Sequence, residues 1–444
     1  MNTSAIDPTV PGVPPSMTGA GDQGYFIIGH GGPCLGDLVP EYGYSCSVGG
    51  GPRAAGQHMH PSGLGSLQLL PHAPYAQPQT GGGSGVLHAW RPAHWFTVQY
   101  AFQSSSAGLN FTRGGFQGAE GFNSNAEWWV EGVREELDAK AEFFYDEPAG
   151  KLLFINNGTT ALPLPSAVFV ATKHKTLFNL TGSAMHPVVG VTLRGLVLRD
   201  TKETFLDPHG TPSGGDWALQ YSAAVTMDGV HSSTVEGCLF TRLDGLAIEL
   251  LGHNRDILIK DNDFEYIGGS AIVLWGRTSA LLNEAGTRRL PAGPHPHGPD
   301  GRGLDVPLST VIVGNSAHDL GVWQKQSSLL FQAIAAKTVL RGNAAYNLPR
   351  AALNLNDDFG GGDHIQGNLF ANCVRESGDH GPINSWSRLP YITTIRNGTA
   401  SILPQPRTIE GNMILGTYSS QECVDNDDGE KSGKSNTLHY FILS

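Results

Sequence analysis

The sequence predicts an all-β protein whose main part is a right-handed parallel β-helix. Glycine is abundant, at 59 of 444 residues, and only 15% of the residues are charged. Long helices are built largely from Ala, Leu, Glu and Lys, and this chain is poor in Glu and Lys. From about residue 186 onward, short apolar runs recur, each followed by Gly-Asn or a similar pair. Each repeat contains two or three such runs instead of a 3.6-residue period, which is typical of stacked β-coils.

The repeated pairs align on one position per unit. These positions are Cys238, Asn262, Asn315, Asn343, Asn368 and Asn412, at intervals of 24, 53, 28, 25 and 44 residues. Three intervals match one coil, and the two longer ones fit either two coils or one coil with an inserted loop. We expect the asparagines to stack at one corner of the solenoid, bonding to one another and to the turn backbone. Where a glycine precedes this position, it lets the chain bend there.

The chain divides into four regions. A small β-rich subdomain follows a loop-rich start, with a short helical turn expected at 133–139 and strands at 142–145, 151–155 and 168–171. The tail shows little repeat character, so we expect the last coil to lack a neighbour, as in a truncated chain. The predicted regions are 1–107 (loop-rich, with strands near its end), 108–185 (subdomain), 186–428 (β-helix) and 429–444 (non-repeat tail).

Charge and composition exclude several classes of partner. The net charge is −12, and the sequence has no Lys/Arg cluster with interleaved aromatic residues, so we expect no nucleic-acid partner. No apolar stretch approaches the roughly 18 residues of a membrane span. The five N-x-S/T sequons, at Asn2, Asn110, Asn157, Asn179 and Asn397, favour a secreted glycoprotein, although the N-terminus contains no recognisable signal peptide.

One segment resembles a known protein family. Residues 356–393, NDDFGGGDHIQGNLFANCVRESGDHGPINSWSRLPYIT, resemble a family of large right-handed β-helix proteins that degrade carbohydrates. The family contains glycoside hydrolases of the fucosidase and xylanase kind. Residues 88–95, 127–146 and 419–429 are also similar to it. The resemblance implies the β-helix fold and a polysaccharide or oligosaccharide partner, and it does not assign catalytic roles to individual residues.

Acidic residues fall at similar offsets from the asparagine ladder in successive coils. Because coils stack about 4.8 Å apart, we expect these residues to converge on one face, about 5–10 Å from one another. Glycosidases use two carboxyl groups about 5–5.5 Å apart when retaining and about 6.5–9.5 Å apart when inverting. Crowding also raises one carboxyl pKa, which provides a general acid. The catalytic candidates are Asp358 and Asp379, with Asp357, Glu376 and Asp427 as alternates.

Further residues nearby are candidates for substrate binding. Imidazole and amide groups can bind sugar hydroxyls, a guanidinium can orient a carboxylate or uronate, and indole rings can stack on sugar rings. Aspartate and asparagine are also common turn residues, so each of these residues has an ordinary structural interpretation. The binding candidates are His364, His380, Asn384, Trp386, Arg388 and Trp323.

We expect no cofactor. The sequence DNDDG does not match an EF-hand, because Gly429 is fifth and Asn436 twelfth when counted from Asp425. A different Ca²⁺ site made from Asp425, Asp427 and Asp428 is the alternative. Three functions stay open: a glycoside hydrolase using paired carboxylates, which is the leading hypothesis; a polysaccharide lyase with Ca²⁺ and Lys325 or Arg388 as base; and a carbohydrate-binding or truncated β-helix without catalysis.

Overall fold

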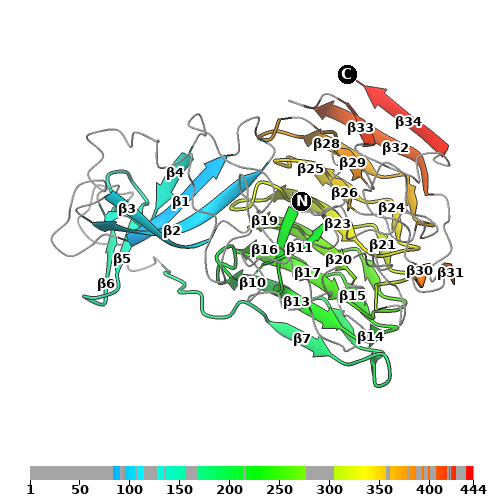
Figure 1. Cartoon of the computed structure of the whole chain (residues 1–444), viewed down its shortest axis with the longest axis horizontal. Coiled ribbons are helices and arrows are strands. Elements are labelled where there is room, and N and C mark those ends of the chain that lie inside the picture. Colours follow the sequence, from blue (N-terminus) through cyan, green and yellow to red (C-terminus); the bar gives the residue numbers. More distant parts are fainter. Residues whose placement is uncertain are drawn as a thin grey trace, which may run out of the picture.

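The computed structural model describes a parallel β-helix with a separate antiparallel sheet beside it (Figure 1). No α-helix occurs among the described residues, and hence none that could cross a membrane. Those residues are 84–90, 94, 96–105, 108–114, 128–134, 137–156, 168–207, 209–213, 217–276, 305–356, 361–378, 380–386, 393–394, 399–400, 407–417, 420, 422–426 and 437–443.

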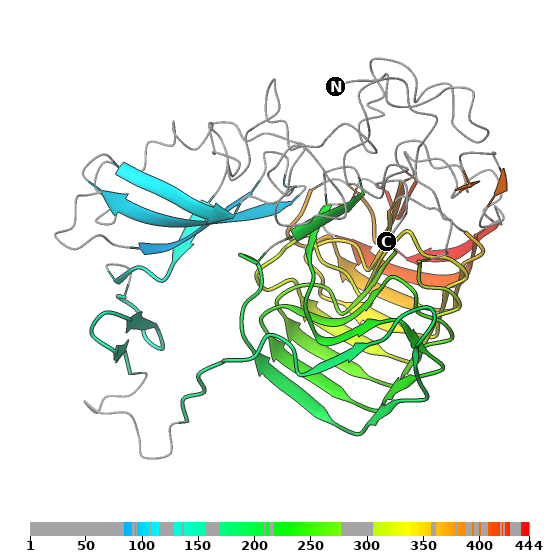
Figure 2. The same ribbon diagram turned by 60° about the horizontal axis from the view of Figure 1, so that its bottom comes forward.

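One wall of the solenoid is an all-parallel sheet that has eight strands among the described residues. Consecutive coils contribute consecutive strands, and Figure 2 shows them stacked along the solenoid. In chain order they are β7 (Phe178–Thr181), β13 (Ala223–Asp228), β17 (Leu246–Leu251), β20 (Ile272–Trp275), β23 (Leu330–Ala333), β26 (Leu353–Asn356), β29 (Ile383–Trp386) and β33 (Val424–Asn426).

The other two walls form one sheet of 14 described strands, because the long β32 (Thr408–Thr417) runs through both. The first arm contains β9 (Thr192–Arg194), β15 (Thr234–Glu236), β18 (Leu258–Lys260), β21 (Val311–Val313), β24 (Val339–Arg341) and β27 (His364–Gln366). The second arm contains β10 (Val197–Thr201), β16 (Leu239–Leu243), β19 (Asp263–Ile267), β22 (Ser316–Leu320), β25 (Ala344–Tyr346) and β28 (Leu369–Cys373).

Five smaller sheets, one of four strands and four of two, lie outside these walls among the described residues. A four-stranded antiparallel sheet has the order β3-β2-β1-β4, so the boundary predicted between 107 and 108 falls between two paired strands. The strands expected at 142–145 and 151–155 are present and pair as an antiparallel hairpin. The strand expected at 168–171 is not present. The remaining elements are β1 (Ser84–Trp90), β2 (Thr97–Ser105), β3 (Gly108–Gly114), β4 (Trp128–Glu131), β5 (Phe143–Asp146), β6 (Lys151–Phe154), β8 (Val188–Val189), β11 (His209–Ser213), β12 (Trp217–Gln220), β14 (Val230–His231), β30 (Thr393–Thr394) and β31 (Thr399–Ala400).

The solenoid begins and ends differently from the prediction. Its first coil starts at Phe178 in β7, which pairs with β13, so the repeat begins before residue 186. The expected helical turn at 133–139 is reduced, within its described residues, to a single turn bond from Leu137 N to Arg134 O. The tail that we expected to lie outside the repeat contains β34 (Thr437–Leu443), which pairs in parallel with β32. Leu438 and Ile442 of β34 are in register with Ile409 and Ile414, although no Gly-Asn pair marks this strand.

The core consists of columns of apolar side chains that stack from coil to coil. One column runs at a single register position through Val235, Ile259, Ile312 and Leu340. Each of these four side chains is completely buried, and β-branched residues suit such a pleated interior. In the next wall Phe240 stacks on Phe264, with ring centroids 4.8 Å apart. Burial of this kind contributes about 1.5–3 kcal/mol per large apolar side chain.

The predicted asparagine ladder is present and continuous. Asn262, Asn315, Asn343 and Asn368 each donate from Nδ2 to the Oδ1 atom of the next asparagine, at 2.8–3.0 Å. Each Oδ1 atom of the ladder also accepts the backbone N–H of the preceding rung. Asn262 therefore neighbours Asn315, and Asn368 neighbours Asn412. Both long intervals are single coils with insertions, and the alternative of two coils is wrong.

The residue before each ladder asparagine makes the bend. Gly237, Gly314, Gly342, Gly367 and Gly411 have φ between 60° and 68°, in the left-handed region that favours glycine. Asp261 takes the same place before Asn262, with φ of 55°, because aspartate tolerates this conformation better than most residues. The Gly-Asn pair in the sequence therefore marks one left-handed residue and one stacking amide.

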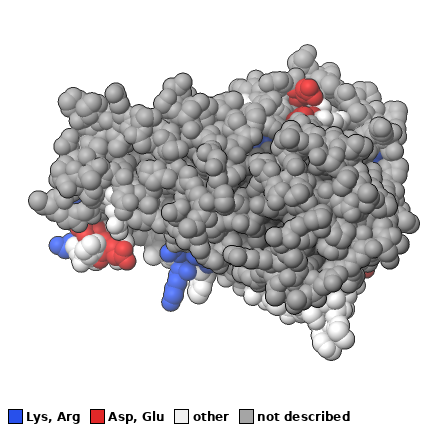
Figure 3. Space-filling model, in the orientation of Figure 1, with Lys and Arg blue, Asp and Glu red and all other residues white. Residues whose placement is uncertain are grey.

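Charge is spread over the described surface. On the face drawn in Figure 3, the described Lys and Arg atoms form small separate spots and no continuous basic surface. Many of the described Lys and Arg side chains are paired with acids. Lys260 and Arg194, for example, both contact Glu236. Together the two cations hold the pKa of Glu236 below its usual value, with the hydrogen bond from Lys260 as the larger cause.

Candidate functional site

The outer face of the eight-stranded sheet presents polar side chains in its C-terminal coils. Leu353 and Ile383 point into the core, so their neighbours Asn354 and Asn384 point outward, as alternation along a strand requires. Asn354, Asn384 and Asp425 are aligned at one register position of β26, β29 and β33. Asn384 Nδ2 donates to Asp425 Oδ2 at 2.7 Å. We call Asn354, Asn384 and Asp425 the polar column.

The polar column is sheltered from solvent. Asn354 and Asn384 are exposed by 0% and 2%. No described atom hydrogen-bonds to the side-chain amide of Asn354. The two preceding coils place the buried residues Val273 and Phe331 at the same register position, and the first three coils place polar residues there (Asn179, Thr226 and Glu249). A buried amide without a partner costs free energy, so a bound polar ligand would offset that cost.

The register shows why equal offsets did not mark equal positions. Counted from their ladder asparagines, Asn354 lies at +11, Asn384 at +16 and Asp425 at +13, yet the three are aligned. The connections between the second arm and the eight-stranded sheet differ in length from coil to coil. Offsets can therefore identify the region, but they cannot pair individual residues.

Most of the predicted carboxylates lie outside the described residues. These carboxylates are Asp357, Asp358, Asp379 and Asp427. The binding candidate Arg388 also lies outside the described residues. In the chain, Asp357 and Asp358 directly follow β26, and Asp427 directly follows β33. These two strands flank β29 in the sheet, so the strand ends that precede these residues lie on either side of β29. The side chain of Trp386, the last residue of β29, is also outside the described residues.

The segment leading into β29 contains two of the predicted residues. Glu376 is exposed, and its Oε2 atom lies 2.9 Å from Nζ of Lys325. His94 anchors this segment, since its Nδ1 atom lies 3.2 Å from the Glu376 carbonyl and its own carbonyl accepts the Gly378 N–H. His380 is buried, with φ of 60°. The segment that leads into β29 is thus held in place by His94, which lies between β1 and β2.

The structure separates two other candidates from the polar column. His364 is exposed on β27, in the first arm of the other sheet. Trp323 lies in the connection between β22 and β23, and its Nε1 atom donates to Asp244 Oδ1 at 3.1 Å. The Trp323 ring is tilted against His88, with centroids 6.0 Å apart. His88 is fully buried, stacks on Trp129 at 5.0 Å and lies 3.3 Å from Glu131, so it does not face an open groove.

Asp244 is a titratable group that the sequence did not reveal. Burial raises the pKa of this carboxyl, the hydrogen bond from Trp323 opposes the shift, and the nearby charges of Glu203 and Glu131 add to it. In the sequence Asp244 precedes Gly245 in an ordinary turn, so no local signal separated it from structural aspartates. Asn354 was missed for a similar reason, because its outward position depends on the register.

No group of three His, Cys, Asp or Glu side chains within the described ranges is arranged to hold a metal ion. Two of the three residues in the alternative Ca²⁺ site, Asp427 and Asp428, lie outside those ranges. Asp425, the third, engages Asn384. The described part of the polar column offers amide and carboxylate oxygens suited to sugar hydroxyl groups.

The fold and this face define the class of structure: a parallel β-helix with a sheltered polar column on one wall. Among solved structures the chain is similar to one described as a glycoside hydrolase, with a TM-score of 0.55 and 13% identity over 81% of this chain and 72% of that chain. DFA-IIIase from Arthrobacter chlorophenolicus A6, in complex with DFA-III, aligns over 55% of this chain and 49% of that chain, with 13% identity and a TM-score of 0.26, too low to support an argument. No protein-family model matches the sequence, and neither does any curated protein.

Proposed function

We propose that the protein is a carbohydrate-active enzyme that hydrolyses glycosidic bonds of a complex polysaccharide at the outer face of β26, β29 and β33. The observation that carries the proposal is the polar column, in which the sheltered amides of Asn354 and Asn384 are aligned with Asp425. A sugar presents hydroxyl groups that such amides and carboxylates can bind in place of water. The shared fold with a glycoside hydrolase is consistent with this proposal.

Hydrolysis needs two carboxyl groups, and we assign these first to Asp358 and Asp379. Asp358 follows β26 and Asp379 precedes β29, so the two residues belong to adjacent coils. Adjacent coils are separated by about 4.8 Å, and coils two apart by about 9.6 Å. Asp358 follows the C-terminal end of β26, whereas Asp379 precedes the N-terminal end of the parallel strand β29, so coil spacing alone does not set the distance between this pair. Asp358 and Asp427 both follow their strands, two coils apart, and that spacing suits an inverting reaction. Asp357 and Glu376 are the alternates.

One observation favours hydrolysis over the lyase alternative. A lyase base must be neutral to take a proton, but Lys325 forms an ion pair with Glu376 and so is used as an ammonium group. Arg388, the other base suggested for a lyase, lies outside the described residues.

The test compares Asp358→Asn, Asp379→Asn and Asp427→Asn with the wild-type protein on xylan, fucosylated and uronate-containing polysaccharides. We expect Asp358→Asn and Asp379→Asn each to reduce the release of reducing sugar about 10²–10⁴-fold, with an unchanged β-rich circular dichroism spectrum. Asp263→Asn is the matched control, because Asp263 is exposed on β19, in a different wall. Wild-type rates in both Asp358→Asn and Asp379→Asn would contradict the assignment. An unsaturated product that is lost with chelator, or binding without turnover, would contradict hydrolysis itself.

A further inference from the structure

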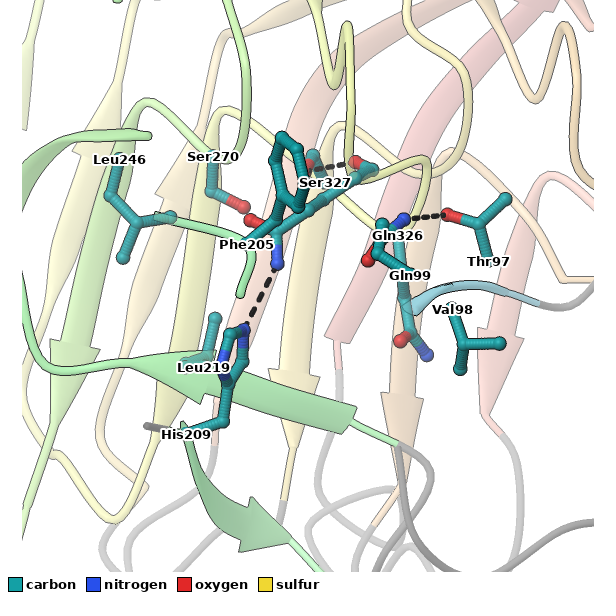
Figure 4. A pocket seen from close by; sticks show the side chains of 11 residues that line it. Thr97, Val98, Gln99, Phe205, His209, Leu219, Leu246, Ser270, Gln326 and Ser327 are labelled. Atoms are coloured by element: carbon teal, nitrogen blue, oxygen red, sulfur yellow. Dashed lines mark hydrogen bonds between the residues drawn. The ribbon is translucent and has the colours of Figure 1, made fainter. Parts of the chain in front are cut away.

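A pocket lies where the antiparallel sheet meets the solenoid (Figure 4). Strand β2 forms one side, and the connection between β22 and β23 forms another. Its polar lining comes from Thr97 and Gln99 of β2, from His209 of β11, and from Ser270, Gln324, Gln326 and Ser327 of the solenoid. Two parts of the chain that are far apart in sequence therefore share one site.

The lining has the chemistry of a site for an uncharged polar ring. None of the described lining residues is an Asp, Glu, Lys or Arg. Side-chain amides and hydroxyls can both donate and accept, which matches the hydroxyl groups of a sugar. Phe205 adds an aromatic wall, and aromatic rings pack well on the apolar faces of sugars. A uronate would find no guanidinium or ammonium group in this lining with which to pair. The one titratable side chain of the described lining is His209, whose Nε2 atom lies 3.2 Å from Gln324 Nε2.

Hydrogen bonds to neighbouring groups hold the lining in place. Gln324 Oε1 accepts from Gln220 Nε2 at 2.9 Å, and Gln324 Nε2 lies 3.2 Å from Nε2 of His209. Gln99 Nε2 donates to Thr97 Oγ1 and to the Trp323 carbonyl, both at 3.2 Å. Amides fixed in this way lose less side-chain entropy when a ligand binds.

The pocket is close to the proposed catalytic face. Lys325 lies between Gln324 and Gln326 in the chain, and its backbone N–H donates to Thr97 Oγ1 at 3.2 Å. The side chain of the same Lys325 pairs with Glu376, in the segment that leads into β29. Lys325 therefore connects the pocket lining to the segment that leads into β29.

We propose that this pocket is an accessory subsite for one uncharged sugar ring of the polysaccharide, which rests on the proposed function. The empty space is about 450 Å³ when the open solvent at its mouth is included, so we expect a bound ring to lie partly in that mouth. The antiparallel sheet then has a direct role in substrate binding, through Thr97 and Gln99.

The test measures binding without turnover. The full chain is labelled with ¹⁵N-glutamine, and the side-chain amide signals of Gln99, Gln324 and Gln326 are followed by NMR. The probes are the methyl glycosides of xylose, fucose, glucose and galactose, each added at millimolar concentration, with methyl glucuronide and methyl galacturonide as charged counterparts. We expect at least one uncharged glycoside to shift all three signals and neither uronide to do so.

Two variants complete the design. Gln326→Phe fills the mouth and should weaken binding of the uncharged glycoside about tenfold or more. Gln103→Phe on the same β2 strand is the matched control, because Gln103 is exposed and does not line the pocket. The proposal is overturned if no uncharged glycoside shifts the three signals, if the uronides bind equally well, or if Gln326→Phe binds like the wild type. Glycoside binding that survives in Asp358→Asn, whatever that variant does to cleavage, separates this subsite from the catalytic assignment.

Discussion

Replacing Asn343 by alanine should destabilise the solenoid strongly. Asn343 is an inner rung of the asparagine ladder and is only 2% exposed. Its Oδ1 atom accepts from the backbone N–H and from the side-chain amide of Asn315, both at 2.9 Å. Its Nδ2 atom donates to the Ile312 carbonyl and to Asn368 Oδ1. Alanine can make none of these four bonds.

The size of the loss follows from the groups left behind. The Asn315 N–H and the Ile312 carbonyl lose their bonds to Asn343 in a buried place that water does not reach. Each unsatisfied buried group costs about 1–3 kcal/mol, so we expect the free energy of unfolding to fall by about 2–6 kcal/mol. Gln366→Ala is the control, because the Gln366 side chain bonds to Glu410 at 2.8 Å on the exposed surface, where such pairs contribute about 1 kcal/mol or less.

Two measurements test this prediction. Urea unfolding followed by circular dichroism gives the global loss, and hydrogen exchange gives the local opening at Asn315, which matters because solenoids can unfold in parts. We expect the Asn315 amide to exchange much faster in Asn343→Ala than in Gln366→Ala. The reasoning is refuted if Asn343→Ala unfolds within about 0.5 kcal/mol of the wild type and the Asn315 amide stays protected.

Three further predictions concern buried groups. Arg407 and Asp363 form an ion pair with exposed fractions of 0% and 1%, so Arg407→Met should reduce the free energy of unfolding by about 3–5 kcal/mol in urea melts. Arg242→Met, at an exposed pair with Asp200, should reduce it by about 1 kcal/mol or less, and equal losses would contradict this. Burial raises the pKa of Cys373 to about 12, so iodoacetamide at about pH 8 should label the more exposed Cys423 before it labels Cys373, as mapped by peptide mass spectrometry. Labelling of Cys373 before Cys423 would contradict the buried position of Cys373. Burial also raises the pKa of Asp244 in the folded state above its ordinary value of 3.8, so the ionised carboxyl lowers stability at neutral pH. Asp244→Asn should therefore be more stable than the wild type in urea melts at pH 7, and the difference should disappear at a pH below 3.8. A less stable variant at pH 7 would show that the ionised form is favoured.

The sequence predicted those parts of the fold that depend on local repetition. The Gly-Asn pairs located the ladder because each pair combines a left-handed residue with a stacking amide, and both properties are local. The antiparallel sheet was divided wrongly because β1 pairs with β4 across about 40 intervening residues, and no local pattern shows that pairing. Strand β34 was missed because Tyr440 lies opposite Asn412 and no residue pairs with Gly411, where the register shifts, so the repeat marker is absent there.

Of the polar column, one residue was named from the sequence as a binding candidate and another was missed. Asn384 was named in advance, and it lies in the polar column beside Asp425. Asn354 was not named, because connections of unequal length shift its offset relative to Asn384. The pocket was also out of reach, since Gln99 and Gln324 meet only through the packing of the antiparallel sheet on the solenoid.

The asparagine ladder also bears on how such a protein can evolve. The two long insertions, at 277–304 and 387–406, both follow strands of the eight-stranded sheet, yet Asn262 still bonds to Asn315 and Asn368 still bonds to Asn412. Loop length at this corner is therefore independent of the pitch of the coil. Insertions and deletions can accumulate beside the polar column while the scaffold keeps its spacing. The chain thus separates the part that must stay constant to fold from the part that is free to change when a new substrate is to be recognised.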